Sequence, residues 1–300
     1  MTDVAPDRLA ALAEAQAPRP HPRPRRSAAP ATSGAERLRR GLTRFYLVLF
    51  FAYLFLPLAI MSAATFNDSR FPTVLPWVGT TTKWFGVLLD DRLMWDALWT
   101  SLIVGAGVVA VSLPTGVAAA LLLSSLHARA RNIVYALMVS PLLTPGVIIG
   151  ISTLIFWDRA FGMAGGVVLT ILAQASFITG YVMLMVLARM QRFDPGLEEA
   201  ALDLGASHAQ VFRRITLPFL MPALGAAAVI AFLQSFENYN TTLFVKGLDT
   251  TLTVYLASQV RTGLTPAVNA LGVILIGITV AGAVLYEVKR RADLRRQEGR

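Results

Sequence analysis

Six apolar stretches of membrane-spanning length constrain this 300-residue chain more than any other feature of its sequence. A helix rises about 1.5 Å per residue, so about 20 apolar residues cross the roughly 30 Å of hydrocarbon in a bilayer. Backbone groups in hydrocarbon must bond to one another, which makes each stretch a helix. The sequence therefore predicts an all-α membrane protein with six transmembrane helices, at Phe45–Thr65, Ala97–Leu123, Ile133–Trp157, Gly166–Leu187, Phe219–Leu243 and Asn269–Tyr286.

Composition supports this class and excludes several kinds of site. Hydrophobic residues make up 55% of the chain and charged residues 15%, too little polar surface to coat a soluble globule. No cysteine occurs, which excludes disulfides and thiolate metal ligands and is consistent with a bacterial inner membrane. The formal charge of +9 lies at chain ends and in short loops, so we expect membrane lipid rather than nucleic acid as a partner.

The positive charges also predict the orientation in the membrane. With the N-terminus in the cytoplasm, 21 of the 27 Lys and Arg residues fall on the cytoplasmic side, in agreement with the positive-inside bias. Both termini are then cytoplasmic, and so is the loop over residues 189–218.

The two ends of the chain differ from the six-helix region over residues 45–290. Residues 1–44 are rich in Ala and Arg and include Pro18, Pro20, Pro22, Pro24 and Pro30. Such a segment buries too little apolar area to offset the entropy of ordering, so we expect a disordered, basic cytoplasmic tail. Residues 291–300 form a second basic cytoplasmic tail. A cleaved signal peptide is the alternative at the N-terminus, but the following apolar stretch has full transmembrane length.

The predicted cytoplasmic loop carries the start and stop residues of two short helices joined at a sharp angle. Asp194 can cap the first helix, with Pro195 in its first turn, and Gly205 ends it. Ser207 followed by Gln210 forms a capping-box pattern for the second helix. Apolar residues recur at helical spacing and predict two ridges that face a cytoplasmic partner: Leu197, Ala201 and Leu204, then Val211, Phe212 and Ile215.

This loop resembles the EAA loop of the ABC importer permeases, with the family's spacing at Glu199, Ala200, Ala201, Gly205, Ile215, Leu217 and Pro218. The resemblance implies a type I importer permease fold whose loop docks on a separate ATPase subunit, with the Glu and the Gly at the docking bend. This chain contains no G-x-x-x-x-G-K-[ST] phosphate loop. It is therefore expected to be a transport subunit and not an enzyme, with ATP and Mg²⁺ bound by the partner ATPase.

Three further segments resemble the spermidine/putrescine branch of these permeases: Phe66–Phe71, Thr81–Phe85 and Leu264–Leu271. The resemblance implies transport of a polyamine from periplasm to cytoplasm by alternating access. It also implies an assembly of two different, homologous permeases, an ATPase dimer and a periplasmic substrate-binding protein. Permeases for aminophosphonate, thiamine, iron and other amino compounds look similar and stay open as alternatives.

The fifth apolar stretch contains a polar run that includes Ser235, Glu237, Asn238 and Asn240. A carboxylate within a membrane segment is costly, so Glu237 is expected to be functional. Its polar neighbours would line a wet substrate pathway. In the polyamine branch an acidic residue occupies this position. An ion pair with the partner permease or a helix-end cap is the alternative interpretation.

Proline and glycine mark other positions in the helices. Pro141 and Pro145 should kink or interrupt the third helix, either as a gate hinge or for packing alone. Small residues let transmembrane helices approach closely, which is the role expected of Gly105, Gly107, Gly272 and Gly277.

Other functional classes find little support. His21, His127 and His208 have no metal-ligand spacing, so we expect neither a metal site nor a catalytic constellation. A secondary transporter should show internal repeats and several intramembrane ionisable groups, whereas only Glu237 is found. A homo-oligomeric channel would need no ATPase partner.

Overall fold

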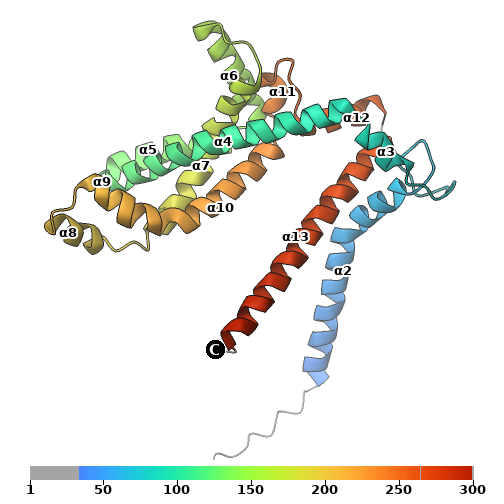
Figure 1. Ribbon diagram of the computed structural model, residues 1–300, viewed down its shortest axis with the longest axis horizontal. Coiled ribbons are helices and arrows are strands. Elements are labelled where there is room, and N and C mark those ends of the chain that lie inside the picture. The colour runs from blue at the N-terminus through green and yellow to red at the C-terminus, as the bar shows by residue number, and fades with distance from the viewer. Residues whose placement is uncertain (1–33, 264, 299–300) are drawn as a thin grey trace, which may run out of the picture. The chain divides into compact units, whose positions relative to one another are not determined.

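The computed structural model describes residues 34–263 and 265–298 (Figure 1). Within these residues every regular element is a helix, apart from one isolated antiparallel bridge between Asn67 and Thr80. The helices are α2 (Gly34–Thr65), α3 (Lys83–Leu89), α4 (Arg92–Ser125), α5 (Ala128–Leu143), α6 (Gly146–Phe161), α7 (Val167–Met190), α8 (Gly196–Asp203), α9 (His208–Val211), the π-helix η1 (Phe212–Thr216), α10 (Leu217–Phe236), α11 (Thr242–Val245), α12 (Leu252–Thr262) and α13 (Pro266–Glu298).

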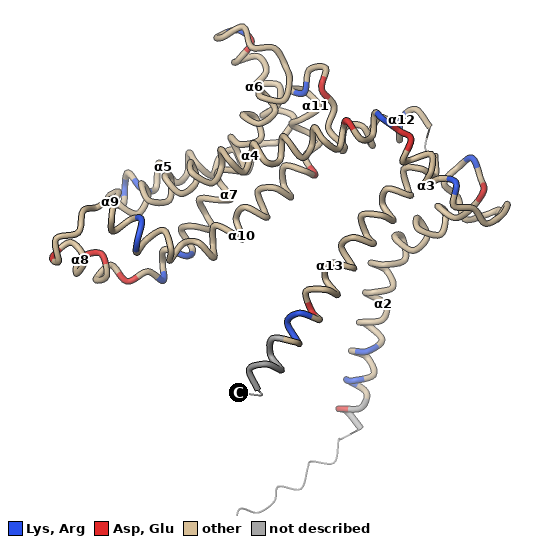
Figure 2. The backbone as a smooth tube through the Cα atoms, in the orientation of Figure 1, with Lys and Arg blue, Asp and Glu red and all other residues tan. Residues whose placement is uncertain are grey.

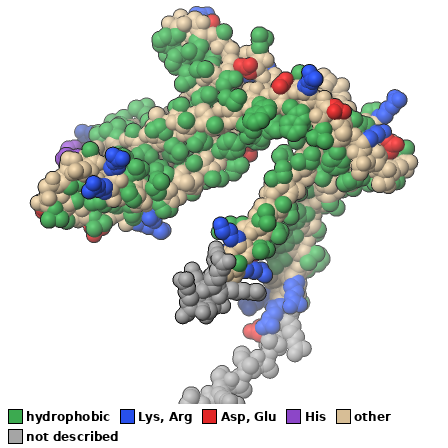
Figure 3. Space-filling view, in the orientation of Figure 1, with side chains coloured by type: hydrophobic (Ala, Val, Ile, Leu, Met, Phe, Trp, Pro, Cys, Tyr) green, Lys and Arg blue, Asp and Glu red, His purple; other side chains and the backbone are tan. Residues whose placement is uncertain are grey.

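Five single helices are long and apolar enough to cross a bilayer: α2, α4, α7, α10 and α13. The sixth predicted span is the pair α5 and α6, which are bent by 105° at a break of two residues. The predicted all-α membrane fold is therefore confirmed, with the third span broken. Charged side chains lie mainly in loops and at helix ends, and apolar side chains cover the long helices (Figures 2 and 3).

The chain divides into two units, residues 1–58 and 59–300. The predicted tail lies outside the described residues over 1–33, but residues 34–44 already belong to α2, so their predicted disorder is wrong. This part contains no proline, and four of its eleven residues are Arg and two are Leu, both good helix formers. An ion pair between Arg40 and Glu36, one turn apart, supports the same turn.

The main core lies where α4, α7 and α10 pack together. Its fully buried side chains include Val104, Val108, Ile178, Met183 and Leu220. Two predicted packing glycines of α4 explain how closely α4 approaches its neighbours. A Cβ on Gly105 would lie 2.8 Å from the Phe232 ring of α10, and one on Gly107 would lie 2.4 Å from Ile171 of α7. Gly272 lies similarly close to Met61, whereas a Cβ on Gly277 would meet nothing within 4 Å, so that packing prediction is wrong within this chain.

A second apolar cluster joins α3 and α12 to the starts of α4 and α13. Met94, Leu252 and Ala270 are its most deeply buried members. Ser101 adds a polar link, because its hydroxyl accepts a hydrogen bond of 2.8 Å from the Leu252 amide. This cluster lies at the end of α4 opposite the α8 and α9 loop (Figure 1).

The break between α5 and α6 falls at Thr144 and Pro145. Pro145 has no amide hydrogen to continue the α5 ladder. After the break, α6 lies against the turn that follows α10: a Cβ on Gly150 would sit 2.7 Å from the Thr241 carbonyl oxygen. The span is thus interrupted at Pro145, whereas Pro141 lies within α5 and does not break it.

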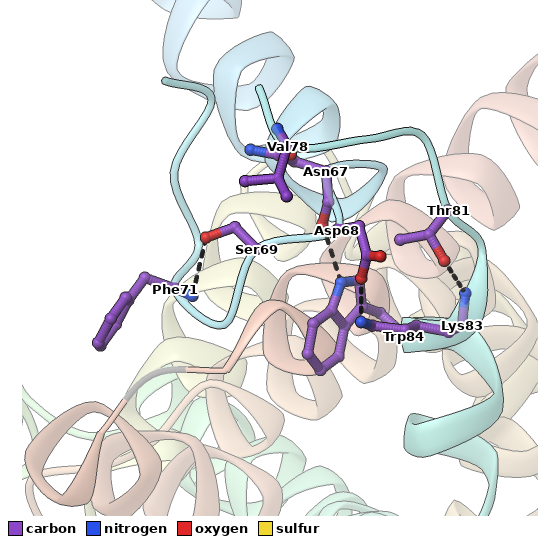
Figure 4. A network of polar contacts seen from close by, with 8 residues as sticks. All are labelled: Asn67, Asp68, Ser69, Phe71, Val78, Thr81, Lys83 and Trp84. Carbon is purple, nitrogen blue, oxygen red and sulfur yellow. Dashed lines mark hydrogen bonds and ion pairs between the residues drawn. The ribbon is translucent and has the colours of Figure 1, made fainter. Parts of the chain in front are cut away.

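The loop between α2 and α3 is organised by the buried side chain of Asn67 (Figure 4). Its amide nitrogen donates to the carbonyls of Thr73 and Pro76, and its amide oxygen accepts from the Val78 amide. The Trp84 indole donates to the Asn67 carbonyl at 3.0 Å. Beside it, Lys83 forms an ion pair with Asp68 (Figure 4).

We predict that Asn67→Ala loosens this loop. It removes three hydrogen bonds of about 1 kcal/mol each, and each factor of ten in the open population corresponds to about 1.4 kcal/mol. Trypsin should therefore cleave after the exposed Arg70 at least about tenfold faster in the detergent-purified variant. Ser69→Ala, which removes one exposed contact to the Phe71 amide, is the control. Equal cleavage of wild type and Asn67→Ala would contradict the assignment.

Candidate functional site

The first helix of the 189–218 loop begins within one residue of the position that the sequence predicts. α8 starts at Gly196 with Pro195 as its N-cap residue, and the Asp194 carboxylate accepts a hydrogen bond of 2.9 Å from the Gly196 amide. Glu198 and Glu199 lie in the first turn of α8. There the negative carboxylates interact favourably with the positive end of the helix dipole.

The bend between α8 and α9 depends on Gly205. Its φ of +85° lies in the left-handed region, where residues with a Cβ are strained. A Cβ placed there would meet nothing within 4 Å, so backbone conformation alone demands glycine. α9 then begins with the predicted capping box: Gln210 accepts from the Ser207 amide at 2.8 Å, and Ser207 accepts from the Gln210 amide at 3.3 Å.

The outward face of the loop is apolar along α8. Leu204 is 89% exposed and Leu197 is 52% exposed, beside the exposed Glu199 and Ala200. Of the first predicted ridge, Leu197 and Leu204 are therefore exposed, whereas Ala201 is half-buried. The second ridge needs a correction, since Val211 is only 5% exposed and packs inward.

The loop enters α10 through a π-helical turn over Phe212–Thr216. The Leu217 amide bonds to the carbonyl of Phe212, five residues earlier. Pro218 has no amide hydrogen, and its ring displaces the carbonyl four residues before it, which favours such a widened turn. Ile215 and Leu217 are half-buried there, while Pro218 is exposed.

Three contacts near the start of α10 were not predicted from the sequence. The Thr216 hydroxyl donates to Glu198 at 2.6 Å. At the end of α7, Arg189 donates to the Phe219 carbonyl at 3.1 Å and places its guanidinium 4.1 Å from the Phe219 ring centroid. Phe193 packs edge-on against the same ring. No spacing rule points to these pairs, because they join residues 18 to 30 positions apart.

At the other end of α10, Ser235 belongs to a buried polar cluster. Its hydroxyl donates to the Gln174 amide oxygen, and the Gln174 amide nitrogen donates to Thr242 at 2.7 Å. Asn238 accepts from the amides of Thr241 and Thr242. These bonds fix the turn after α10, so Ser235 and Asn238 hold the structure here, and a solute does not reach the buried Ser235 in this conformation.

The prediction that Glu237 lies inside a membrane helix is wrong. Glu237 lies directly after the last residue of α10. The expected helix to Leu243 stops at Phe236 because Asn238 captures the amide hydrogens of the next turn, a competition typical of Asn side chains. Glu237 and Asn240 are both exposed. Among the predicted pathway residues, these two are free to meet a solute.

Near this end of the molecule an open cavity of about 440 Å³ is lined by Leu93, Asp96, Ala97, Thr100, Leu248, Asp249, Thr250, Tyr255, Ser258 and Gln259. Burial, and a hydrogen bond to the Asp91 carboxylate, raise the pKa of Tyr255 to about 12. The pKa of Tyr255 in the folded protein lies above its ordinary value of 10. The protonated phenol therefore contributes stability to the fold that is fully present below pH 10 and is lost as the pH rises to about 12. Tyr255 is therefore a protonated donor at physiological pH.

The sequence of residues 112–292 matches the model of a protein family described as the binding-protein-dependent transport system inner membrane component. The match covers the second part of α4, all of α7 and α10, the loop with its Gly205 bend and most of α13. The chain belongs to this family. It is thus an inner-membrane permease of a binding-protein-dependent transport system, a transport component rather than an enzyme.

Curated relatives resemble the permease over most of its length. It is 34% identical over 258 residues to the putrescine transport system permease protein PotI of Escherichia coli K12, covering 83% of this chain and 91% of the relative. It is 29% identical over 256 residues to the spermidine/putrescine transport system permease protein PotC of the same strain, covering 85% and 95%.

Solved structures agree in fold. A chain of a bacterial ABC transporter that imports the acidic polysaccharide alginate superposes with a TM-score of 0.64 at 16% identity, covering 88% of this permease and 99% of that chain. A second structure of an alginate ABC transporter, in complex with its pentasaccharide-bound periplasmic protein, gives a TM-score of 0.63 at 17% identity, covering 84% and 93%. The fold is therefore that of ABC importer permeases.

We predict that Gln174→Leu destabilises the permease by about 2 kcal/mol, because the buried hydroxyl of Ser235 loses its acceptor. The melting temperature in detergent, followed by tryptophan fluorescence, should fall by several degrees. Gln191→Leu replaces an exposed glutamine at the end of α7 and serves as the control. A melting temperature equal to that of wild type would show that the cluster contributes nothing.

Proposed function

We propose that this permease moves a polyamine, putrescine or spermidine, from the periplasm to the cytoplasm as one subunit of an ATP-driven importer. The observation that carries the substrate class is the 34% identity to a putrescine permease over 83% of the chain. The exposed carboxylate of Glu237 and the two carboxylates of the open cavity, Asp96 and Asp249, suit a cationic amine. Permeases of this fold also carry other solutes, so another amino compound, aminophosphonate, thiamine or iron is the second candidate.

The proposed assembly contains a second, homologous permease, a dimer of ATPase subunits and a periplasmic binding protein that selects the substrate. ATP and Mg²⁺ would bind to the ATPase subunits. Both termini and the 189–218 loop would lie in the cytoplasm, where the loop docks on the ATPase. The proposed contact residues are Glu199, Ala200, Ala201, Gly205, Ile215, Leu217 and Pro218.

The shape of the loop supports this docking. The two exposed leucines of α8, Leu197 and Leu204, provide an apolar edge, while Ala200 lets a partner approach closely. When ATP closes the ATPase dimer, the docked α8 would move as a rigid body and carry α7 and α10 with it. Such a movement alternates access to a site between the permeases.

The translocation path would run past Glu237 and Asn240. They lie in the turn that faces the break between α5 and α6, where Gly146 approaches Thr241. Pro145, in that break, and Pro141, in the last turn of α5, are the proposed gate hinge. Irregular backbone at membrane depth occurs where it lines a cavity or is buried in protein, which suits such a path.

Uptake of radiolabelled putrescine and spermidine, with and without this gene, tests the proposal. Cold amino acids, thiamine, iron chelates and aminophosphonate serve as competitors. Deletion should abolish polyamine uptake in a strain without other polyamine importers, and the intact gene should restore it. Unchanged polyamine uptake would reject the substrate class, and loss of uptake of one of the other solutes, supplied in labelled form, would identify the second candidate.

Glu199→Arg and Gly205→Pro should each uncouple transport while membrane insertion is preserved. The first reverses the charge beside the proposed docking edge, and the second is incompatible with the φ of +85° at the bend. Uptake should fall at least about tenfold, equivalent to 1.4 kcal/mol, and the ATPase should no longer co-purify. Arg192→Glu, an exposed reversal outside the proposed contact set, is the control. Normal ATP-dependent uptake in both variants would refute the docking assignment.

Glu237→Gln keeps the size of the side chain and removes its charge. We expect uptake of a cationic polyamine to fall about three- to tenfold, roughly the 1 kcal/mol scale of a partly screened ion pair. Asp158→Asn neutralises another exposed carboxylate, in α6, and should leave uptake near that of wild type. Identical uptake kinetics in wild type and Glu237→Gln would reduce Glu237 to a structural role.

A further inference from the structure

The backbone connection from α8 to α10 is flexible. It passes through the Gly205 bend, the single turn of α9 and the five-residue π-helix. Glycine permits many backbone conformations, and π-turns are rare and weakly bonded. A movement applied to α8 would be absorbed in these joints if the chain were the only link to α10.

A second link bypasses these joints. The Glu198 carboxylate, in the first turn of α8, accepts a hydrogen bond of 2.6 Å from the Thr216 hydroxyl. Thr216 is the last residue of the π-helix and is only 3% exposed, and Glu198 is half-buried. Hydrogen bonds to a carboxylate are short and strong, more so when water is largely excluded.

The segment held by Glu198 is also held from α7. Arg189 donates to the Phe219 carbonyl and lies over the Phe219 ring, and Phe193 packs against the same ring. Thr216 and Phe219 are one helical turn apart, so the two attachments grip consecutive parts of the start of α10. The end of α7, the first turn of α8 and the start of α10 thus meet around residues 216–219.

We propose that Glu198 and Thr216 are positioning residues that make α8 and the start of α10 move as one lever. The proposal rests on the proposed docking of the loop on an ATPase. Neither residue needs to touch the ATPase or the solute, since Thr216 is buried inside the permease. The pair sets how much of each ATPase movement reaches the membrane helices.

The test uses the complete importer in proteoliposomes and measures putrescine transported per ATP hydrolysed. Thr216→Val removes the hydroxyl and keeps the β-branched shape, and Thr216→Ser keeps the hydroxyl. We expect Thr216→Val to lower the ratio at least threefold, with the ATPase still co-purifying, and Thr216→Ser to stay within twofold of wild type. Glu198→Ala should match Thr216→Val, whereas Glu198→Gln, which keeps an acceptor oxygen, should retain most of the ratio.

The double variant Glu198→Ala/Thr216→Val should be no worse than either single variant, because both remove the same bond. Additive losses, or an unchanged ratio in Thr216→Val, would overturn the proposal. Loss of ATPase co-purification in Thr216→Val and Glu198→Ala would also overturn it, because the residues would then act in docking. If Thr216→Val fails to insert, the comparison of Glu198→Ala with Glu198→Gln decides alone. Failure of docking itself is seen separately, in normal coupling of Glu199→Arg.

Discussion

Backbone hydrogen bonding in the absence of water is the constraint on which the rest of this structure depends. A bilayer offers the chain no solvent partner, so each interruption of a helix must be paired within the protein. The two interruptions in the membrane region, at Thr144–Pro145 and after Phe236, lie against each other. Asn238 bonds the open amides of the second one, and Gln174 joins the cluster from α7. The turn after α10 is therefore held by a polar cluster set into packed helices.

The 189–218 loop is under a different constraint, because most of its residues are exposed and water can satisfy their backbone groups. It can bend sharply at Gly205 and widen into a π-turn before Pro218 without burying an unpaired group. What it needs is stiffness between its ends. The capping box of α9 stiffens the chain locally, and the contacts of Thr216 and Phe219 tie the loop to the membrane helices. Hydrogen bonds between neighbouring residues thus stiffen the loop locally, while contacts between residues far apart in the sequence attach it to the helices.

Sequence reasoning succeeded where the cause is local. The places of the membrane helices follow from apolar runs, the capping box of Ser207 and Gln210 from its short spacing, and the broken span from Pro145. It failed where tertiary or competing interactions decide. The end of α10 was predicted too late because apolarity continues past Phe236, while the bonds of Asn238 stop the helix. The inward position of Val211 and the pairing of Glu198 with Thr216 depend on how α8, η1 and α10 pack, which no periodicity reveals.

The two kinds of glycine in this permease have different genetic consequences. Gly107 packs against Ile171, whose Cδ1 would lie 2.4 Å from an added Cβ, so a second substitution that shrinks the isoleucine can make room for a larger residue. Gly205 has open space around it and is required only by its left-handed backbone. No neighbour can be trimmed to relieve that strain. Intragenic suppressors should therefore arise readily for the first glycine and be absent for the second, where only reversion restores the bend.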